Sequence, residues 1–209
     1  MPLNEPIMVG IDVGGERKGF HAVALKGRAF EITTSTESAE IVAWCLAQKA
    51  LVVAVDAPCA WSREGSSRKT ERDLRLFGEK IHCFATPTRE RAVANTKVFY
   101  DWVFRGEALY QQLQQYYPLF IGVHGTGPVC IETFPHAAAC ALAGRVVSAK
   151  HKASVRRDVL MCHDYDTGGL PNIDYVDAAI CAVTAKAFLT NRYQCFGDRA
   201  EGYIIVPAD

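Results

Sequence analysis

The stretch Ile7-Met-Val-Gly-Ile-Asp-Val-Gly-Gly15 decides how the chain folds. Its near-continuous apolar run predicts a strand that is covered on both faces. The strand delivers one carboxylate, Asp12, into a turn where Gly14 and Gly15 tolerate positive φ and leave room for close approach. A buried charge without a partner is costly. Asp12 is therefore either a site residue or only the cap of a hairpin turn.

Two further strands follow this first one. The segments Gly19–Leu25 and Ala29–Thr33 are apolar or alternating, and Lys26-Gly-Arg28 between them is typical of a tight turn. Three strands joined by short turns predict an antiparallel meander. A capping-box pattern, Thr34-x-x-Glu37, then predicts a helix that runs to about residue 49.

A fourth strand is predicted over Leu51-Val-Val-Ala-Val-Asp56, and like the first strand it is apolar and ends in an acid. The helix before it acts as a crossover, which implies parallel pairing with an earlier strand. The simplest partner is the strand of Asp12. Both acids then lie at the carboxyl ends of neighbouring strands, where open α/β sheets bind ligands.

The remaining pattern predicts one domain over residues 1–209, with a helical insertion around residues 60–128. A long helix over Asn95–Tyr117 is its main element, and we consider it as the surface of a homodimer. The other expected elements are helices over Ser67–Phe77, Pro135–Gly144, residues 149–161 and Asp174–Leu189, a strand over Val129–Phe134, and a closing strand or extended segment over Gly202–Pro207.

Composition excludes several classes of protein. The chain has 209 residues, of which 49% are hydrophobic and 22% charged, so global disorder is excluded. The formal net charge is zero, so there is no overall basic field for nucleic acid. No apolar run reaches the roughly 18 residues of a membrane span. The eight cysteines form no CxxC pair and match no zinc module, which favours reduced thiols in a cytoplasmic protein.

Five acids are delivered by strand ends or by the start of one helix: Asp12, Asp56, Glu132, Asp174 and Asp177. If they converge, their repulsion must be neutralised, and three or more carboxylates call for cations. An all-oxygen set suits Mg²⁺ or Mn²⁺ rather than zinc. Two such ions are a common device for hydrolysing phosphodiester bonds.

Each acid also has a simpler explanation. Asp174 is placed to be a helix N-cap, and Asp177 to complement the helix dipole. Glu132 is equally suited to pairing with a nearby Arg, and Asp56, before Ala-Pro, to a turn.

The motifs Gly-Ile-Asp12-Val-Gly-Gly, Val-Asp56-Ala-Pro, Ile-Glu132-Thr-Phe-Pro and Asp174-Tyr-Val-Asp177-Ala-Ala resemble, in order, the landmarks of the DUF429 family, predicted ribonuclease H-like nucleases. Arg68-Lys-Thr-Glu-Arg72-Asp-Leu and Phe84-Ala-Thr-Pro87 resemble further landmarks, and the match runs from about residue 8 to residue 207. The resemblance implies a mixed α/β sheet of five strands in the order 3-2-1-4-5, the first three antiparallel, with helices on both faces.

The resemblance also implies site residues. In the wider superfamily, acids on the first and fourth strands and on a late helix bind two metal ions, and Asp12, Asp56 and Asp177 match those places. Asp174-x-x-Asp177 resembles the late-helix acid pair of Holliday-junction resolvases. We therefore predict metal ligation by Asp12, Asp56, Asp174 and Asp177, with catalytic roles for Asp12, Asp56, Asp177 and Glu132. Glu132 is the exception, because the fifth strand is not a standard place for a catalytic acid.

Basic side chains from two predicted helices are candidates for binding the phosphates of a nucleic-acid substrate: Arg68, Arg72, Lys150 and Lys152. The simpler explanation for each is a solvated charged face. His136 is a further candidate, as a proton carrier near the acids.

Three functions compete at this stage. The first is a metal-dependent nuclease that uses two Mg²⁺ or Mn²⁺ ions. The second is a nucleotide-binding phosphotransferase of the actin and sugar-kinase type, because Asp12-Val-Gly-Gly resembles the first phosphate loop of that superfamily. The third is a nucleic-acid-binding module that keeps the fold without the chemistry.

Overall fold

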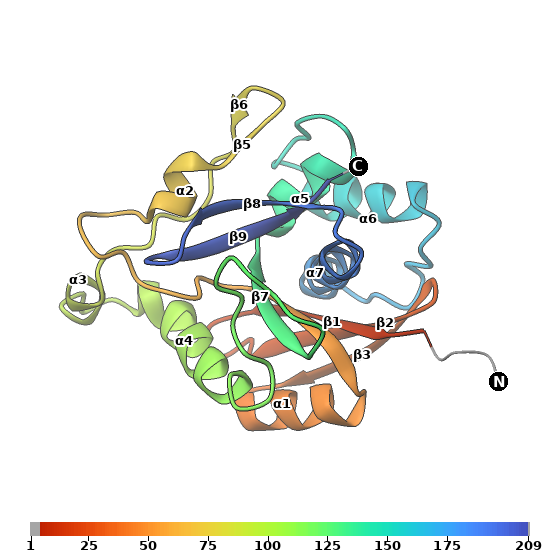
Figure 1. Ribbon diagram of the computed structural model, residues 1–209, viewed down its shortest axis with the longest axis horizontal. Helices are drawn as coiled ribbons and strands as arrows, with labels where there is room; N and C mark the ends of the chain where they lie inside the picture. Colours follow the sequence, from red (N-terminus) through yellow and green to blue (C-terminus); the bar gives the residue numbers. More distant parts are fainter. Residues whose placement is uncertain (1–4, 209) are drawn as a thin grey trace.

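The computed structural model describes residues 5–208, which form a mixed seven-stranded sheet with helices on both faces (Figure 1). The strands lie in the order β3-β2-β1-β4-β7-β9-β8. Their bounds are β1 Ile7–Val13, β2 Phe20–Lys26, β3 Ala29–Ser35, β4 Ala50–Asp56, β7 Val129–Thr133, β8 Tyr193–Asp198 and β9 Gly202–Pro207.

The first five positions of the sheet have the strand order 3-2-1-4-5 that the resemblance implies. Strand β2 is antiparallel to both β1 and β3, and β4 and β7 continue the sheet parallel to β1. The predicted parallel pairing of the two acid-bearing strands is thus confirmed. The prediction of five strands is too low, because β9 pairs parallel with β7 and β8 pairs antiparallel with β9. Strand β8 escaped prediction because its sequence, Tyr193-Gln-Cys-Phe-Gly-Asp198, has neither an apolar run nor a clear apolar alternation.

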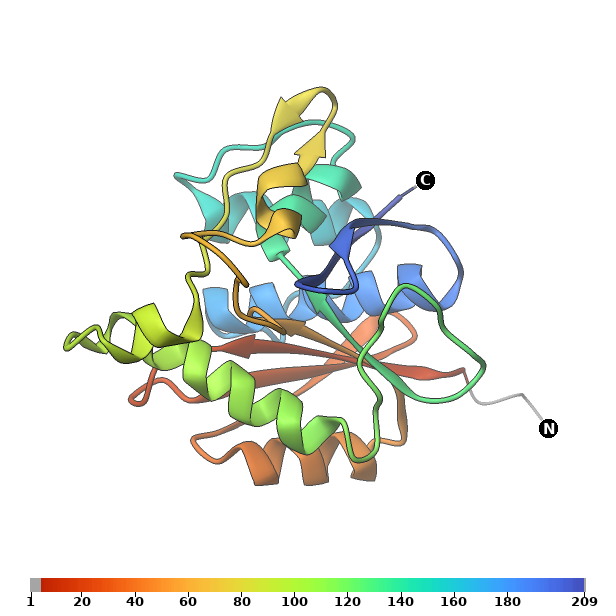
Figure 2. The same cartoon turned by 60° about the vertical axis from the view of Figure 1, so that its left-hand side comes forward.

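Two apolar cores lie on opposite faces of the sheet (Figure 2). Helices α1 (Ser38–Ala47) and α4 (Asp101–Leu113) cover one face. Helices α5 (Pro135–Leu142), α6 (Lys152–Cys162) and α7 (Ile173–Leu189) lie on the other. The predicted double coverage of β1 is confirmed, since Val9 and Ile11 pack with the first group and Met8 with the second.

The segment between β4 and β7 is less helical than predicted. The helix expected over Ser67–Phe77 ends early as α2, Lys69–Asp73. A small hairpin follows it, formed by β5 (Arg75–Leu76) and β6 (Glu79–Lys80), with Phe77 and Gly78 both at positive φ in its turn. Helix α3 (Arg89–Val93) and a 3₁₀ turn η1 (Val98–Tyr100) then lead into α4.

Helix α4 begins at Asp101 rather than near residue 95. Its glycine, Gly106, weakens the helix intrinsically, but a Cβ there would lie 2.7 Å from the Cβ of Ala57, so the glycine permits close packing on the segment after β4. The helix side chains Val103, Leu109 and Leu113 are buried inside this chain. A homodimer through this helix stays a prediction.

The predicted capping box before α1 is wrong. Thr34 is still part of β3, and its hydroxyl donates to the carbonyl of Phe20 across the sheet at 2.9 Å. Helix α1 starts at Ser38 instead, and Glu37 precedes it without a capping hydrogen bond from its side chain.

The eight cysteines, which all lie among the described residues, are free, as predicted. Over the same residues, no helix has both the length and the apolar character required to cross a membrane.

Helix α7 crosses β1 at Gly10 in unusually close contact. A Cβ built on Gly10 would lie 1.9 Å from the carbonyl oxygen of Ala178 and 2.3 Å from the amide nitrogen of Ala182. Real Cβ atoms do not approach backbone atoms so closely, so any side chain here would push the helix off the strand. The absence of a side chain at Gly10 therefore sets the separation between β1 and α7.

We expect Gly10→Ala to lower the free energy of unfolding by about 3 kcal/mol, at the upper end of the cost of overpacking a core, because the clash is with backbone. The measurement is urea unfolding followed by circular dichroism. The matched control is Gly169→Ala, since a Cβ there meets no atom within 4 Å. Equal stability of the two variants would contradict the role given to Gly10.

Candidate metal centre

Three carboxylates meet where β1, β4 and α7 converge. Asp12 and Asp56 are register partners on the two parallel strands. Asp177 lies near the start of α7 and is buried. One carboxylate oxygen from each of the three lies within 4.8 Å of the others. The predicted convergence of these acids is therefore seen in the structure.

The face of the sheet explains why these acids meet. Side chains alternate along a strand, so Asp12 lies on the same face as Gly10 and Met8. Asp56 likewise shares a face with Ala54, which packs in the α7 core. Both acids therefore face α7, and Asp177 faces them from the helix.

Burial and like charge raise the pKa of each carboxyl. Burial raises the pKa of Asp12 to about 7, and the charges of Asp177 and Asp174 add to the effect. Burial also raises the pKa of Asp56 well above its ordinary value, with repulsion from Asp12 and Asp177 next in size. The pKa of Asp177 is raised by burial too, although Arg156 opposes the rise.

Three cations partly neutralise the cluster. Arg156 on α6 donates to Asp177, and Lys152 lies 3.8 Å from the same carboxylate. Lys18, from the turn after β1, lies 3.1 Å from Asp174. Although Arg156 lies in a stretch rich in charged residues, its side chain is buried against the acid that it pairs with. With Asp174 included, four carboxylates face three cations, which leaves one negative charge.

Asp174 is not the N-cap of α7. Asn172 holds that position, and its side-chain oxygen accepts hydrogen bonds from the amides of Asp174 and Tyr175 at 3.0 and 3.2 Å. The carboxylate of Asp174 is thereby left to pair with Lys18 beside Asp12.

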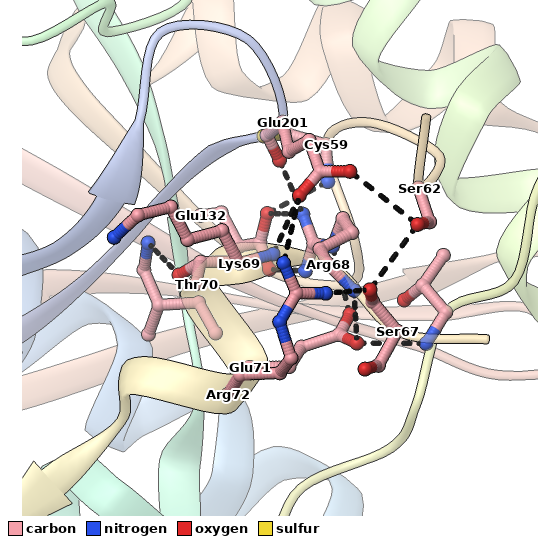
Figure 3. A network of polar contacts seen from close by, with 12 residues as sticks. Cys59, Ser62, Ser67, Arg68, Lys69, Thr70, Glu71, Arg72, Glu132 and Glu201 are labelled. Atoms are coloured by element: carbon pink, nitrogen blue, oxygen red, sulfur yellow. Dashed lines mark hydrogen bonds and ion pairs between the residues drawn. The ribbon is translucent and has the colours of Figure 1, made fainter. Parts of the chain in front are cut away.

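Glu132 is placed differently from the other acids. It follows Ile131, which packs toward α7, so its own side chain leaves β7 on the opposite face. There it is buried and bound by Arg68, whose Nη1 donates at 2.8 Å, and by the amide of Cys59 at 2.8 Å (Figure 3). The simpler explanation, pairing with an arginine, is thus what the structure shows.

Arg68 is predicted to bind phosphate, but its side chain is only 1% exposed. Its Nε donates to Glu71 at 2.7 Å while its other nitrogens bind Glu132 (Figure 3). With these donors taken up inside the protein, we assign Arg68 a structural role. Glu71 in turn accepts from the amides of Arg68 and Thr86, at 3.0 and 2.9 Å.

The other predicted phosphate-binding residues are exposed. Arg72 donates to the carbonyl of Ser67 and lies 3.9 Å from Glu201, within the same network (Figure 3). Lys150 precedes α6, and Lys152 begins it beside Asp177. His136 is half-buried, and its Nε2 lies 4.0 Å from the sulfur of Cys140.

A cavity of about 60 Å³ lies next to Asp56. Its walls include three aromatic side chains from separate segments, Phe84, Trp102 and Phe134. The rings of Phe84 and Trp102 are 4.9 Å apart, and that of Phe99 lies 5.8 Å from Phe84. Phe99 is 59% exposed, so the aromatic series runs from beside Asp56 to the surface.

Sequence reasoning missed His21 and the cationic role of Lys18. His21 on β2 is the register partner of Asp12, and one of its ring nitrogens lies within 4.8 Å of ligand oxygens of Asp12 and Asp174. Burial lowers the pKa of His21, and Lys18 adds to the effect while Asp174 opposes it. The short turn between β1 and β2 fixes the register, so counting outward from it would have paired the two residues.

A family model described as "Protein of unknown function (DUF429)" matches residues 10–202. The chain belongs to the DUF429 family. Among solved structures, the Thermus thermophilus RuvC structure is similar to this DUF429 protein, with a TM-score of 0.42 and 14% sequence identity over 89% of this chain and 95% of that one. Among curated proteins, none matches the chain in sequence.

The donor set of this DUF429 protein fits a hard divalent cation. The three closest ligands are carboxylate oxygens, which Mg²⁺ and Mn²⁺ prefer. The cluster also has one more carboxylate than cations, and two of its three cations, Lys18 and Lys152, are half-exposed or more. A divalent ion would therefore relieve the repulsion that raises the pKa values of the acids.

We expect Asp12→Asn to stabilise the metal-free protein at pH 8. The carboxyl has a pKa of about 7 when folded against an ordinary 3.8, so the folded state binds its proton more tightly. Stability is therefore lost as pH rises between these values, and the asparagine avoids that loss. The gain should be roughly 2 kcal/mol at pH 8, below the limit set by about 1.4 kcal/mol per pKa unit, and should vanish near pH 4.

The measurement is urea unfolding in a chelator at pH 8 and at about pH 4. Asp164→Asn is the matched control, because Asp164 is an exposed acid paired with Arg28, and it should change stability little at either pH. If Asp12→Asn proves less stable than wild type at pH 8, the acids do not repel one another as described.

Proposed function

We propose that this protein is a metal-dependent hydrolase of phosphodiester bonds in nucleic acid. The observation that carries the proposal is the meeting of Asp12, Asp56 and Asp177, from two strands and one helix, within 4.8 Å at one end of the sheet. A buried carboxylate cluster with raised pKa values is typical of a functional site. The order of the strands that deliver it is the order expected from the resemblance to ribonuclease H-like nucleases.

In this proposal Asp12, Asp56 and Asp177 hold divalent ions, with Asp174 as a further ligand. Such ions, when bound, stabilise developing negative charge and make water a better nucleophile. Arg156 keeps Asp177 oriented, since it is buried against that carboxylate. Glu132 supports the site indirectly by binding the amide of Cys59, three residues after Asp56.

The surroundings of the cluster support nucleic acid as the substrate. Lys18, Lys150 and Lys152 are exposed on the α6 and α7 side, where they are suited to phosphate groups. On the other side of the cluster, the cavity next to Asp56 is lined by Phe84 and Trp102, and Phe99 contacts Phe84. These aromatic rings are suited to stacking with unpaired bases. Basic groups combined with aromatic platforms are typical of proteins that bind single-stranded segments.

We expect wild type to cleave a mixed panel of single-stranded and branched DNA and RNA with Mn²⁺ or Mg²⁺, and Asp12→Asn to lose at least about 100-fold of that rate. The reason is the loss of a charged ligand on which the metal chemistry depends. The measurement is gel-resolved cleavage with and without chelator, and Asp164→Asn is the control.

Three other outcomes would contradict the proposal in different ways. An Asp12→Asn variant that cleaves like wild type would remove Asp12 from the chemistry. Thermal stabilisation by ATP without cleavage would favour the phosphotransferase. Metal-independent binding of nucleic acid without cleavage, unchanged in the variant, would favour the binding module.

We expect Phe99→Ala to weaken the binding of single-stranded nucleic acid roughly five-fold, because stacking on one aromatic residue contributes about 1–3 kcal/mol and Phe99 is at the exposed end of the series. Fluorescence anisotropy in Ca²⁺, which suppresses turnover, measures the affinity. The matched control is Tyr116→Ala, an aromatic residue of similar exposure beyond the far end of α4. Equal losses in both variants would argue against an aromatic platform at Phe99.

A further inference from the structure

A second group of ligand atoms lies beside the three acids. It consists of Asp12, His21 and Asp174, each offering one ligand atom within 4.8 Å of the others. Asp12 belongs to both groups. The second group differs from the first in chemistry, because one of its members is an imidazole.

The sheet holds His21 in this place. It is the register partner of Asp12 on the antiparallel strand β2, so the two side chains lie next to each other on one face. Its neighbours on that face of β2, Val23 and Leu25, pack in the α7 core. The ring of Tyr175, from the first turn of α7, meets the imidazole edge-on with centroids 4.8 Å apart.

One ring nitrogen of His21 has no hydrogen-bond partner among the described residues, although it is buried. The residue is only 9% exposed, and this nitrogen is Nδ1. A buried polar atom without a hydrogen bond is unfavourable for folding. A histidine kept solely for packing would be replaceable by an apolar residue without this cost, so the position points to a ligand.

A cation already lies at this group in the protein. The ammonium of Lys18 is 3.1 Å from both carboxylate oxygens of Asp174. The Lys18 side chain is 62% exposed and extends from a turn, whereas that of Asp174 is only 15% exposed. The lysine can therefore swing into solvent and leave Asp174 to another cation without disturbing the core.

We propose that Asp12, His21 and Asp174 form a second cation site, with a nitrogen ligand that makes it prefer Mn²⁺ to Mg²⁺. The inference rests on the proposed function, because it shares Asp12 with the all-carboxylate group. Imidazole binds transition-metal ions well, whereas Mg²⁺ favours oxygen ligands. The carboxylate group accepts either ion, and the histidine group gives the centre its selectivity.

The first test uses the whole wild-type protein with ¹⁵N-labelled histidine and MnCl₂ alone. Mn²⁺ is paramagnetic, so its binding broadens the ring signals of a coordinating histidine first. We expect the His21 signals to vanish at substoichiometric Mn²⁺ while those of His163, an exposed histidine whose Nε2 contacts the carbonyl of Leu142, persist. Preservation of the His21 signals at saturating Mn²⁺ would overturn the inference without any variant.

The second test is calorimetry with Mn²⁺ and with Mg²⁺. We expect His21→Asn to weaken Mn²⁺ binding at one site about ten-fold or more and to change Mg²⁺ binding less than about two-fold, because only the nitrogen ligand is lost. His163→Asn is the matched control and should change neither. His21→Asp restores a charged ligand of oxygen type, so it should bind both ions and lose the preference for Mn²⁺.

The outcomes separate this inference from the proposed function. If His21→Asn, folded by circular dichroism, binds Mn²⁺ like wild type while Asp56→Asn does not, the carboxylate centre stands and the histidine site is wrong. If wild type binds neither ion, both the histidine site and the metal-dependent function are wrong. Mn²⁺ bound only at the neighbouring carboxylates would also broaden the His21 signals, because broadening acts through space. If His21→Asn does not fold, the same calorimetry on His21→Asp therefore decides: loss of the preference for Mn²⁺ supports the inference, and a preference equal to that of wild type overturns it.

Discussion

The contact between Gly10 and the backbone of α7 is the constraint on which the rest of the molecule depends. It brings the helix onto β1 so closely that no side chain fits between them. Asp12 lies two residues beyond Gly10 on the same face, and Asp177 directly precedes Ala178, whose carbonyl faces Gly10. The packing that builds the core therefore also sets the separation of the two acids. Their repulsion is overcome by burial of the apolar helix, in which residues 175–185 are all buried.

A second constraint fixes the chain after Asp56. Arg68 and Glu132 form a buried ion pair. Such a pair adds little net stability, because both charges lose their hydration, but we infer that it selects one arrangement of the chain. Glu132 also binds the amide of Cys59 (Figure 3). Tyr110 of α4 donates to the carbonyl of Ala57 at 3.1 Å. The segment leaving β4 is thus held from both sides. We infer that the network keeps the backbone next to Asp56 rigid, which a metal ligand requires.

Apolar periodicity was sufficient to predict β1, β4 and β7 and the neighbouring positions of Asp12 and Asp56, because strands that are buried on both faces leave a strong signal. The expectation that Asp177 joins them came from the family resemblance. It failed where long-range contacts override local pattern. Thr34 fits a capping box by spacing, yet the sheet takes it as a strand residue. Arg156 lies in a charged stretch and is nevertheless buried, because Asp177, distant in sequence, lies opposite it. The side of the sheet on which Glu132 lies depends on the alignment of β7 with β4, which no local pattern gives.

The three cations at the centre are not equivalent, and the difference favours ion binding. Arg156 is buried with Asp177, so removing it would leave a charge stranded in the core. Lys18 and Lys152 are 62% and 50% exposed, and solvent compensates either side chain when it leaves its acid. With both lysines in solvent, the four acids in their ionised form face one guanidinium, which is an excess of three negative charges. Folding tolerates that excess only while protons or the two lysines offset it, so a cation from outside the chain would be a favourable partner for the cluster.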